Sequence, residues 1–266
     1  MDRLKDTFSK LKEKEEKALV GFVSAGDPDL ETSLEIVRDM CKNGLDILEL
    51  GVPFSDPTAD GPVIQRSSAR ALKHHISLGD VIAMTGRIRA FTDIPIILFS
   101  YYNPVFSYGA EKFYLDAVKN GADGVLIVDL PPEESEEMTD KWAGNDLSLI
   151  RLVAPTTPVD RMKLIAEGAS GFLYMVSKTG VTGSDGLNTS SVETYVNQLR
   201  SVTPLPICVG FGISTPEDVR AISKTADGIV IGSAFERLIE NNLDHPDLPR
   251  LMGEQTKLFK QATRKG

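Results

Sequence analysis

The sequence predicts an α/β fold in which eight strand–helix units close into a parallel barrel, that is, a TIM barrel. Eight short apolar runs alternate with longer stretches of helical period along the 266 residues. The runs are almost continuously apolar, which is typical of parallel strands covered on both faces. A doubly wound open sheet is the rival, but no dinucleotide-type glycine-rich turn follows the first run. We therefore expect one barrel domain over residues 1–266.

The eight expected strands are five to seven residues long, and each ends near glycine or polar residues. In chain order they are 18–24, 46–52, 94–100, 124–130, 147–153, 171–176, 206–210 and 228–232.

The stretches between the runs carry helix signals. Residues 29–44 place apolar side chains at steps of three or four. Thr157 and Thr215 are each followed by proline and, three residues after the threonine, by an acid, which predicts helix N-caps. Three glycines just before expected strands suit C-caps with a left-handed backbone, namely Gly44, Gly121 and Gly168.

The segment before the first strand, residues 1–17, predicts an extra helix. Leu4, Phe8 and Leu11 share one face of that helix. We expect this apolar face to pack across the bottom of the barrel.

Composition excludes several classes of protein. A net charge of -9 argues against nucleic acid as a main partner, although one small phosphorylated ligand needs only a local site. The two cysteines, Cys41 and Cys208, are expected to be buried thiols, and the three histidines lie at no strand end, so no metal site is expected. The charged N-terminus is no signal peptide and no run could cross a membrane, so a cytoplasmic location is expected.

Two carboxylates mark the end of the second strand, and active sites of this fold lie at the C-terminal ends of strands. Glu49 stands where an apolar residue is expected, and burial there would raise its pKa toward neutral pH for acid–base work. The alternative is a structural carboxylate tied to a backbone N–H or an arginine. Asp60 closes the following loop, residues 53–61, and its alternative role is a helix N-cap.

Other polar and aromatic residues follow the strands at the same end. Tyr101 and Tyr174 either line a pocket or pack at the barrel top. Asp129 is either a ligand acceptor or a strand-end cap. The glycine-rich residues 177–188 are expected to form a mobile lid over the site, with a plain surface loop as the alternative.

Glycines after the last strands predict a phosphate site. Gly212 follows the seventh strand, and Gly232 and Ser233 follow the eighth at the start of a short helix. Backbone N–H groups and a helix N-terminus attract anions, and this is the usual phosphate position in the fold. Gly183 on the lid segment could close this cradle, although each glycine alone could merely form a turn.

The segment LELGVPFSDPTADGPVIQ, from Leu48 to Gln65, resembles the signature of the tryptophan synthase α chain family. The resemblance covers essentially the whole chain. It continues through the segments 26–28, 101–104, 129–131, Tyr174, 180–183, 210–214 and 232–234.

This resemblance implies a lyase that cleaves indole-3-glycerol phosphate to indole and glyceraldehyde 3-phosphate, without a cofactor of its own. It implies Glu49 as the acid–base residue and Asp60 as the second catalytic carboxylate. Contacts to the phosphate would come from Gly183, Gly212, Gly232 and Ser233. Contacts around the indole and the closing loop would come from Phe22, Tyr101, Asp129, Tyr174 and Thr182.

The resemblance also implies a partner, a β chain that carries pyridoxal phosphate, in an assembly of two α and two β chains. One departure is visible, because Lys178 stands where the family usually has arginine. Two rivals stay open at this point. One is another phosphosugar enzyme, such as a Schiff-base aldolase using Lys178, and the other is a non-catalytic barrel that only activates a β chain.

Overall fold

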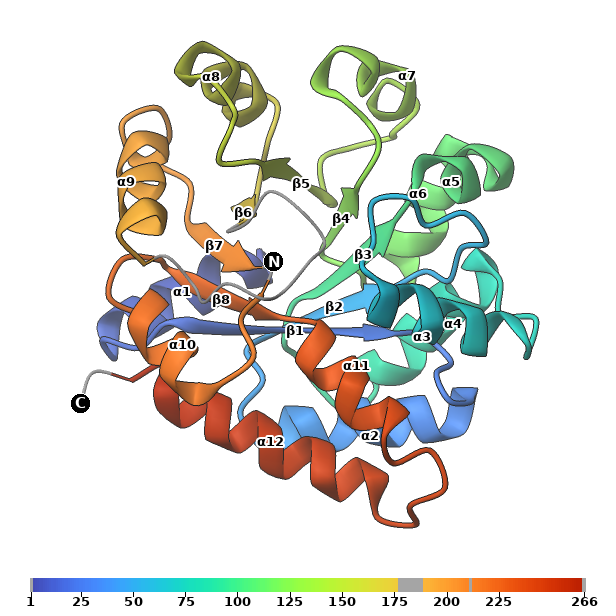
Figure 1. Ribbon diagram of the computed structural model, residues 1–266. Coiled ribbons are helices and arrows are strands. Elements are labelled where there is room, and N and C mark those ends of the chain that lie inside the picture. The colour runs from blue at the N-terminus through green and yellow to red at the C-terminus, as the bar shows by residue number, and fades with distance from the viewer. Residues whose placement is uncertain (1, 177–188, 211, 265–266) are drawn as a thin grey trace.

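A computed structural model describes residues 2–176, 189–210 and 212–264. Its eight strands are all parallel and follow one another around a closed barrel, with β1 paired to both β2 and β8 (Figure 1). The strands are β1 Ala18–Ser24, β2 Ile47–Gly51, β3 Ile96–Ser100, β4 Gly124–Ile127, β5 Ser148–Val153, β6 Leu173–Val176, β7 Ile207–Gly210 and β8 Gly228–Ile231. The predicted TIM barrel and its eight strands are confirmed.

Helices surround the barrel, because each strand is followed by at least one helix that packs its apolar stripe against the sheet (Figure 1). The helices are α1 Arg3–Glu13, α2 Leu30–Lys42, α3 Pro62–Leu72, α4 Leu78–Arg89, α5 Tyr102–Tyr108, α6 Ala110–Lys119, η1 Pro132–Glu134, α7 Glu136–Thr139, α8 Val159–Glu167, α9 Thr189–Arg200, α10 Pro216–Ile222, α11 Ser233–Glu240 and α12 Leu248–Ala262.

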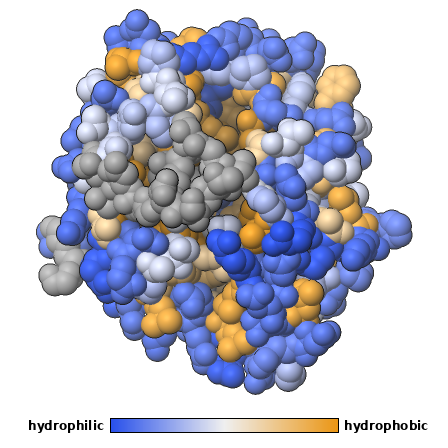
Figure 2. All heavy atoms as spheres, in the orientation of Figure 1, coloured by the Kyte–Doolittle hydropathy of each residue, from blue (hydrophilic) through white to orange (hydrophobic). Residues whose placement is uncertain are grey.

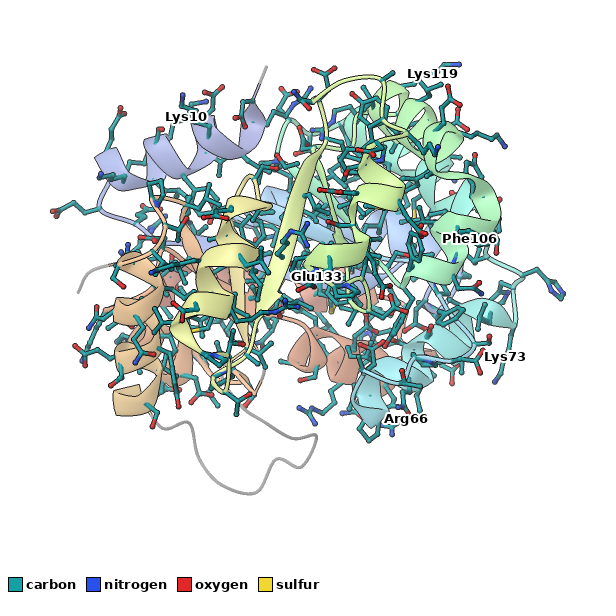
Figure 3. All side chains as sticks on the ribbon, turned by 90° about the horizontal axis from the view of Figure 1, so that it is seen from above. Lys10, Arg66, Lys73, Phe106, Lys119 and Glu133 are labelled. Atoms are coloured by element: carbon teal, nitrogen blue, oxygen red, sulfur yellow. The ribbon has the colours of Figure 1, made fainter. Side chains whose placement is uncertain are left out.

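Two apolar clusters make up the core. The larger lies between the strands and the helices, and the smaller fills the barrel interior. Helix α1 closes one end of this interior, with Leu4 and Leu11 buried and Phe8 packed edge-on to Phe172 at a ring distance of 6.0 Å. The predicted plug at the barrel bottom is confirmed. Figure 3 shows α1, marked by Lys10, at one end of the molecule and Arg66 of α3 at the other.

The helix caps predicted from local sequence signals are confirmed at some positions and wrong at others. Thr215 caps α10 in a full capping box, and Gly44 and Gly121 have positive φ angles as expected. Thr157 is not an N-cap, because its hydroxyl accepts the N–H of Ala154 and Pro158 takes the cap position of α8. Gly168 has a φ of -92°, so the expected left-handed C-cap is wrong there.

Cys208 is buried in β7, whereas Cys41 on α2 is only half-buried, which corrects the expectation of two buried thiols. The histidines are exposed, as expected. Within the described ranges, no helix is long and apolar enough to cross a bilayer.

Candidate active site

Glu49 is the third residue of β2 and points into the barrel interior, level with Phe22 on β1 and Ile97 on β3. Its exposed fraction is 1%, and neither carboxyl oxygen has a hydrogen-bond partner among the described residues. Burial raises the pKa of Glu49 to about 8. The alternative of a structural carboxylate tied to a backbone N–H or an arginine is therefore not what this part of the structure shows.

Asp60 lies at the end of the loop between β2 and α3, and Tyr101 holds it there. The Tyr101 hydroxyl accepts the backbone N–H of Ala59 at 3.0 Å and hydrogen-bonds to the Asp60 carboxylate. Burial raises the pKa of Asp60 to about 6, against the lowering effect of the Tyr101 bond. The N-cap of α3 is Gly61, so Asp60 does not serve as the cap. The ring of Phe54 packs on Tyr101 at 5.1 Å and ties the loop to β3.

Two glycines make room for aromatic rings at the mouth of the barrel. A β carbon on Gly51 would come within 2.6 Å of the Phe22 ring, and one on Gly210 would come within 2.2 Å of the Tyr174 hydroxyl. No side chain larger than hydrogen fits at either position without moving a buried ring. Phe22 also meets Phe99 edge-on at 5.2 Å, so the rings form an apolar floor.

The phenol of Tyr174 lies close enough to both carboxyl groups for each of them to affect its pKa. It is buried on β6, and both burial and the nearby Glu49 and Asp60 carboxyls raise the pKa of its phenol well above 10. The phenol therefore stays protonated. Glu49 and Asp60 therefore both lie near the Tyr174 phenol.

The opposite side of the mouth has the predicted anion features. Gly212 follows β7 with a φ of +78°, a conformation that other residues adopt only with strain. Gly232 is the N-cap of α11 and Ser233 is its first residue, and no side chain caps this helix end. Its first-turn N–H groups are therefore available to an anion. Ser233 accepts a hydrogen bond from Arg237 at 3.3 Å.

Asp129 has a structural partner. Its carboxylate accepts the backbone N–H of Tyr102 at 2.7 Å and so caps the start of α5, while the side chain remains exposed. Of the two roles expected for Asp129, the structure shows the cap, and the exposed carboxylate is also accessible to a ligand. Thr182, Gly183, Lys178 and the expected lid 177–188 lie outside the described residues.

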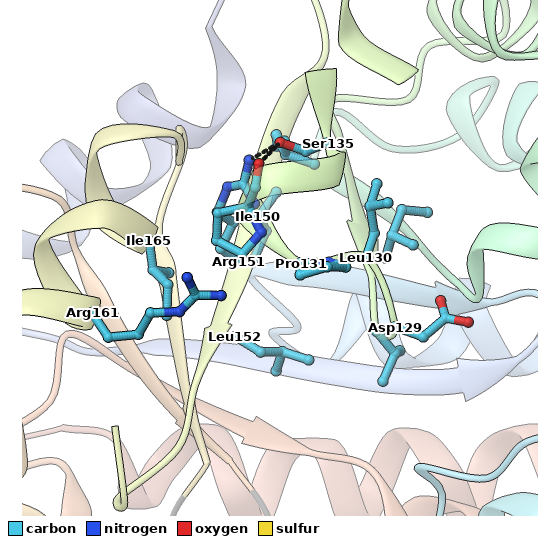
Figure 4. A pocket seen from close by; sticks show the side chains of 13 residues that line it. Asp129, Leu130, Pro131, Ser135, Ile150, Arg151, Leu152, Arg161 and Ile165 are labelled. Carbon is cyan, nitrogen blue, oxygen red and sulfur yellow. Dashed lines mark hydrogen bonds between the residues drawn. The ribbon is translucent and has the colours of Figure 1, made fainter. Parts of the chain in front are cut away.

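A cavity of about 440 Å³ opens beside this mouth, between the ends of β4 and β5 and helix α8 (Figure 4). Its lining includes Asp129, Leu130, Arg151 and Arg161, and neither Glu49 nor Asp60 belongs to it. Figure 2 shows hydrophobic residues inside a hollow that is bordered mostly by hydrophilic ones. No group of three or more His, Cys, Asp or Glu suited to a metal occurs in the described ranges.

Chemically, the site offers a neutral carboxyl group at neutral pH, a second carboxylate that is largely ionised, and an apolar aromatic floor. The uncapped start of α11, whose N–H groups could bind an anion, lies across the mouth. This combination suits a substrate with a flat apolar ring at one end and a phosphate at the other, and a reaction that moves protons between them.

Sequence reasoning missed the clearance role of Gly51 and Gly210. It also missed the bond that joins Tyr101 to the Asp60 loop. The role of Gly51 could have been predicted, because side chains alternate between the two faces of a strand and Gly51 therefore lies on the same barrel face as Glu49. The contact between Gly210 and Tyr174 crosses between strands, and only the register shows it.

Comparisons with known proteins agree with this geometry. The family profile described as "Tryptophan synthase alpha chain" matches residues 8–264. A protein of that name from Desulfatibacillum aliphaticivorans is 62% identical over 99% of this chain and 100% of its own length. One from Desulfosudis oleivorans is 60% identical over the same shares. The crystal structure of tryptophan synthase subunit alpha from Legionella pneumophila superposes with a TM-score of 0.91 at 37% identity, covering 99% of this chain and 98% of that one. The chain therefore belongs to the tryptophan synthase alpha chain family.

Proposed function

We propose that Glu49 and Asp60 perform the reaction of this family in the present chain. As a member of the family, the chain is a lyase of tryptophan biosynthesis that cleaves indole-3-glycerol phosphate to indole and glyceraldehyde 3-phosphate. The observation that carries the residue assignment is Glu49 itself. It is a buried carboxyl group at the C-terminal end of a barrel strand, it has no hydrogen-bond partner among the described residues, and both it and Asp60 lie close enough to Tyr174 to raise the pKa of that phenol.

Glu49 acts first as an acid and then as a base. Its carboxyl group gives its proton to C3 of the indole ring, which becomes a positively charged indolenine. The resulting carboxylate then removes the proton from the hydroxyl on the adjacent glycerol carbon. The oxygen forms the carbonyl of the aldehyde, the carbon–carbon bond breaks, and its electron pair returns to the ring. The added proton stays on C3 of indole, and Glu49 ends protonated, ready for another turnover.

Asp60 stabilises the charged intermediate. Positive charge on the ring makes the indole N–H more acidic, and an ionised carboxylate beside it lowers the energy of that state. The bond from Tyr101 supports this role, since it favours the charged form of Asp60 and fixes its position.

The remaining assignments describe substrate binding. Phe22, Tyr101 and Tyr174 surround the ring, and Thr182 and Asp129 contribute from the closing loop and the end of β4. Gly183, Gly212, Gly232 and Ser233 bind the phosphate by their N–H groups and by the Ser233 hydroxyl. The uncapped start of α11 supports the phosphate end.

The family works with a beta subunit, and we extend this to the present chain. The proposed assembly has two α and two β chains, in which indole passes through a tunnel to the β chain. Pyridoxal phosphate belongs to the β chain, and the α chain uses none. The proposed location is the cytoplasm.

Release of indole from indole-3-glycerol phosphate tests the assignment. The purified chain should release indole slowly alone and much faster with a tryptophan synthase β chain. Glu49→Gln should lose at least ~100-fold of kcat, as removal of a general acid–base group does. The surface variant Glu217→Gln is the matched control and should keep full activity. Near-normal activity of Glu49→Gln would refute the role of Glu49, and fast release without a β chain would indicate a free-standing indole producer.

A further inference from the structure

A second pair of buried carboxyl groups lies outside the barrel interior, where β1, α3 and α11 meet. Glu236 on α11 has an exposed fraction of 0% and Asp27, in the loop after β1, has one of 1%. Neither side chain has a part in the reaction described above. Buried acids at this depth are costly unless each oxygen has a partner, so their contacts are informative.

Arg70 forms a close, hydrogen-bonded ion pair with Asp27 and only a distant ion pair with Glu236. Nε and Nη2 of Arg70 on α3 each donate to one oxygen of Asp27 at 2.7 Å. The same Nη2 lies 4.0 Å from Oε2 of Glu236, beyond hydrogen-bonding distance. Oε1 of Glu236 accepts the N–H of Ser24, the last residue of β1, at 2.7 Å. Oε2 meets no N–H or O–H donor in the described part of the chain and faces the Asp27 carboxyl within hydrogen-bonding range.

A proton between the two acids satisfies this arrangement. The charged groups around Glu236 are Asp27 from the loop after β1, Arg70 and Arg66 from α3, and Glu240 from its own helix. With Glu236 ionised, three carboxylates would face two guanidinium groups. With Glu236 protonated, the charges balance and Oε2 donates to Asp27. Burial and the neighbouring Asp27 hold the pKa of Glu236 well above its ordinary value. Helix α12 meets α11 through apolar rings here, Phe259 against Phe235.

This carboxyl pair connects both ends of the substrate site. Glu236 lies in the first turns of α11, whose start forms the proposed phosphate site. Arg70 and Ser67 lie one turn apart on α3, the helix that directly follows the Asp60 loop. Ser67 also shares a hydrogen bond of 2.7 Å with the Ser24 hydroxyl. Arg66, the most exposed member of the group, lies on α3 at the edge of the molecule in Figure 3.

We propose that Glu236 is a positioning residue, whose protonated carboxyl group bonds Ser24 and Asp27 and so fixes the start of α11 against β1 and α3 for binding of the phosphate end of the substrate. This inference rests on the proposed phosphate site. Loss of the proton would place two carboxylates face to face and break the Oε2 bond. The start of α11 would then shift relative to Gly212 and the Asp60 loop. The affinity for phosphate esters should therefore fall at alkaline pH, while the chemical step at Glu49 depends on a different proton.

The test is binding of glycerol 3-phosphate, measured by calorimetry from pH 7 to pH 10, to the whole chain and to Glu236→Gln. A glutamine amide can accept from Ser24 and donate to Asp27 without a titrating proton. The Kd of the original chain should rise roughly five- to tenfold at the alkaline end, about the equivalent of one hydrogen bond, and that of Glu236→Gln should stay flat. Equal pH dependence in the two proteins, or none in either, would overturn the proposal. The ligand lacks the indole ring, so titration of Glu49 does not enter the comparison.

Two further measurements separate this proposal from the phosphate site on which it rests. Ser233→Ala should weaken glycerol 3-phosphate binding at every pH, and no change would refute the phosphate site itself.

The second measurement is the melting temperature of the free protein, which needs no ligand. Folded Glu236 keeps its proton where the unfolded chain has lost it, so the original chain should lose stability relative to Glu236→Gln as pH rises above about 4.5. The exposed variant Glu217→Gln should show no such trend, and a constant gap for Glu236→Gln would contradict the shared proton.

Discussion

At the scale of single residues, Glu49 shows how much a reactive group can oppose folding. Its carboxyl group is buried at the centre of the barrel with no hydrogen-bond partner in the part of the chain that the structure describes, so those residues do not stabilise its charged form. The protein tolerates it because the group stays protonated near neutral pH. Burial lowers the stability of the folded chain and also raises the pKa of Glu49 into the range in which a carboxyl group can exchange protons near neutral pH. The reactivity and the energetic cost therefore have one cause.

Glu49→Gln should therefore stabilise the free chain near neutral pH. The folded state keeps the Glu49 proton up to about pH 8, whereas the unfolded chain releases it near pH 4.5. Stability is thus lost as pH rises between these values, by about 3 kcal/mol at pH 7, and a glutamine does not pay this penalty. Urea unfolding of both proteins between pH 4.5 and pH 8.5 measures the effect. A difference in unfolding free energy that does not widen with pH would contradict the raised pKa of the buried Glu49.

The two carboxyl pKa values also predict a bell-shaped pH profile. The proposed mechanism requires an ionised Asp60 and a protonated Glu49, so kcat/KM of the isolated chain should rise with pH through about 6 and fall above about 8. The substrate phosphate titrates near pH 6 as well. The variant Asp60→Asn distinguishes titration of Asp60 from titration of the substrate phosphate. If Asp60 causes the fall in activity at acidic pH, the residual activity of this variant should not fall there. Persistence of the limb in that variant would assign it to the substrate instead.

At the scale of elements, the site depends on two glycines whose missing side chains leave room for aromatic rings of the neighbouring strands. Tyr174 on β6 occupies the space that a side chain at position 210 on β7 would need. The same holds for Phe22 on β1 and position 51 on β2. Glycine at the end of one strand thus makes room for a ring on the preceding strand, and these rings form the apolar floor on which the substrate would lie in the proposed mechanism.

Gly210→Ala should test this relation. The new β carbon would lie 2.2 Å from the Tyr174 hydroxyl, so the buried ring must move at a cost of about 1–3 kcal/mol in stability. Gly79→Ala on α4 is the matched control, since its nearest neighbours lie at 3.6 Å and alanine favours helix. Thermal melting and indole release measure the outcome. A Gly210→Ala protein as stable and active as the Gly79→Ala control would contradict the close contact between position 210 and the Tyr174 hydroxyl.

The elements themselves were largely predictable from the sequence, and their contacts were not. Continuous apolar runs fixed the eight strands, because parallel strands bury both faces. Residue type and place at a strand end singled out Glu49, whereas the role of Asp60 came from the resemblance of the segment 48–65 to a known family. Thr157 shows the limit of local signals, since its hydroxyl had a competing partner in Ala154. The pairing of Asp27 with Glu236 joins positions more than 200 residues apart, and no local pattern encodes such a contact.

At the scale of the whole molecule, the mouth of the barrel is also the face on which a partner would receive the product. Helix α5 begins directly after β3 at this end and carries Phe106, which is 67% exposed. A large exposed aromatic residue is typical of the central contacts of an interface. The Phe106 ring packs on Tyr102 at 5.9 Å, and Tyr102 directly follows Tyr101, which holds the Asp60 loop. We therefore expect a β chain to cover this part of the mouth.

Phe106→Asp should weaken activation by the β chain and leave the isolated chain unchanged. The exposed ring contributes little to folding, so melting temperature and intrinsic indole release should stay the same. Burying a charge in the interface should raise the concentration of β chain needed for half-maximal activation at least tenfold. Leu258→Asp is the matched control, because Leu258 is also exposed, at 50%, but lies on the outer helix α12. Equal activation of the two variants would place the partner on another face, whereas a loss confined to Phe106→Asp ties activation to the mouth where Asp60 is held.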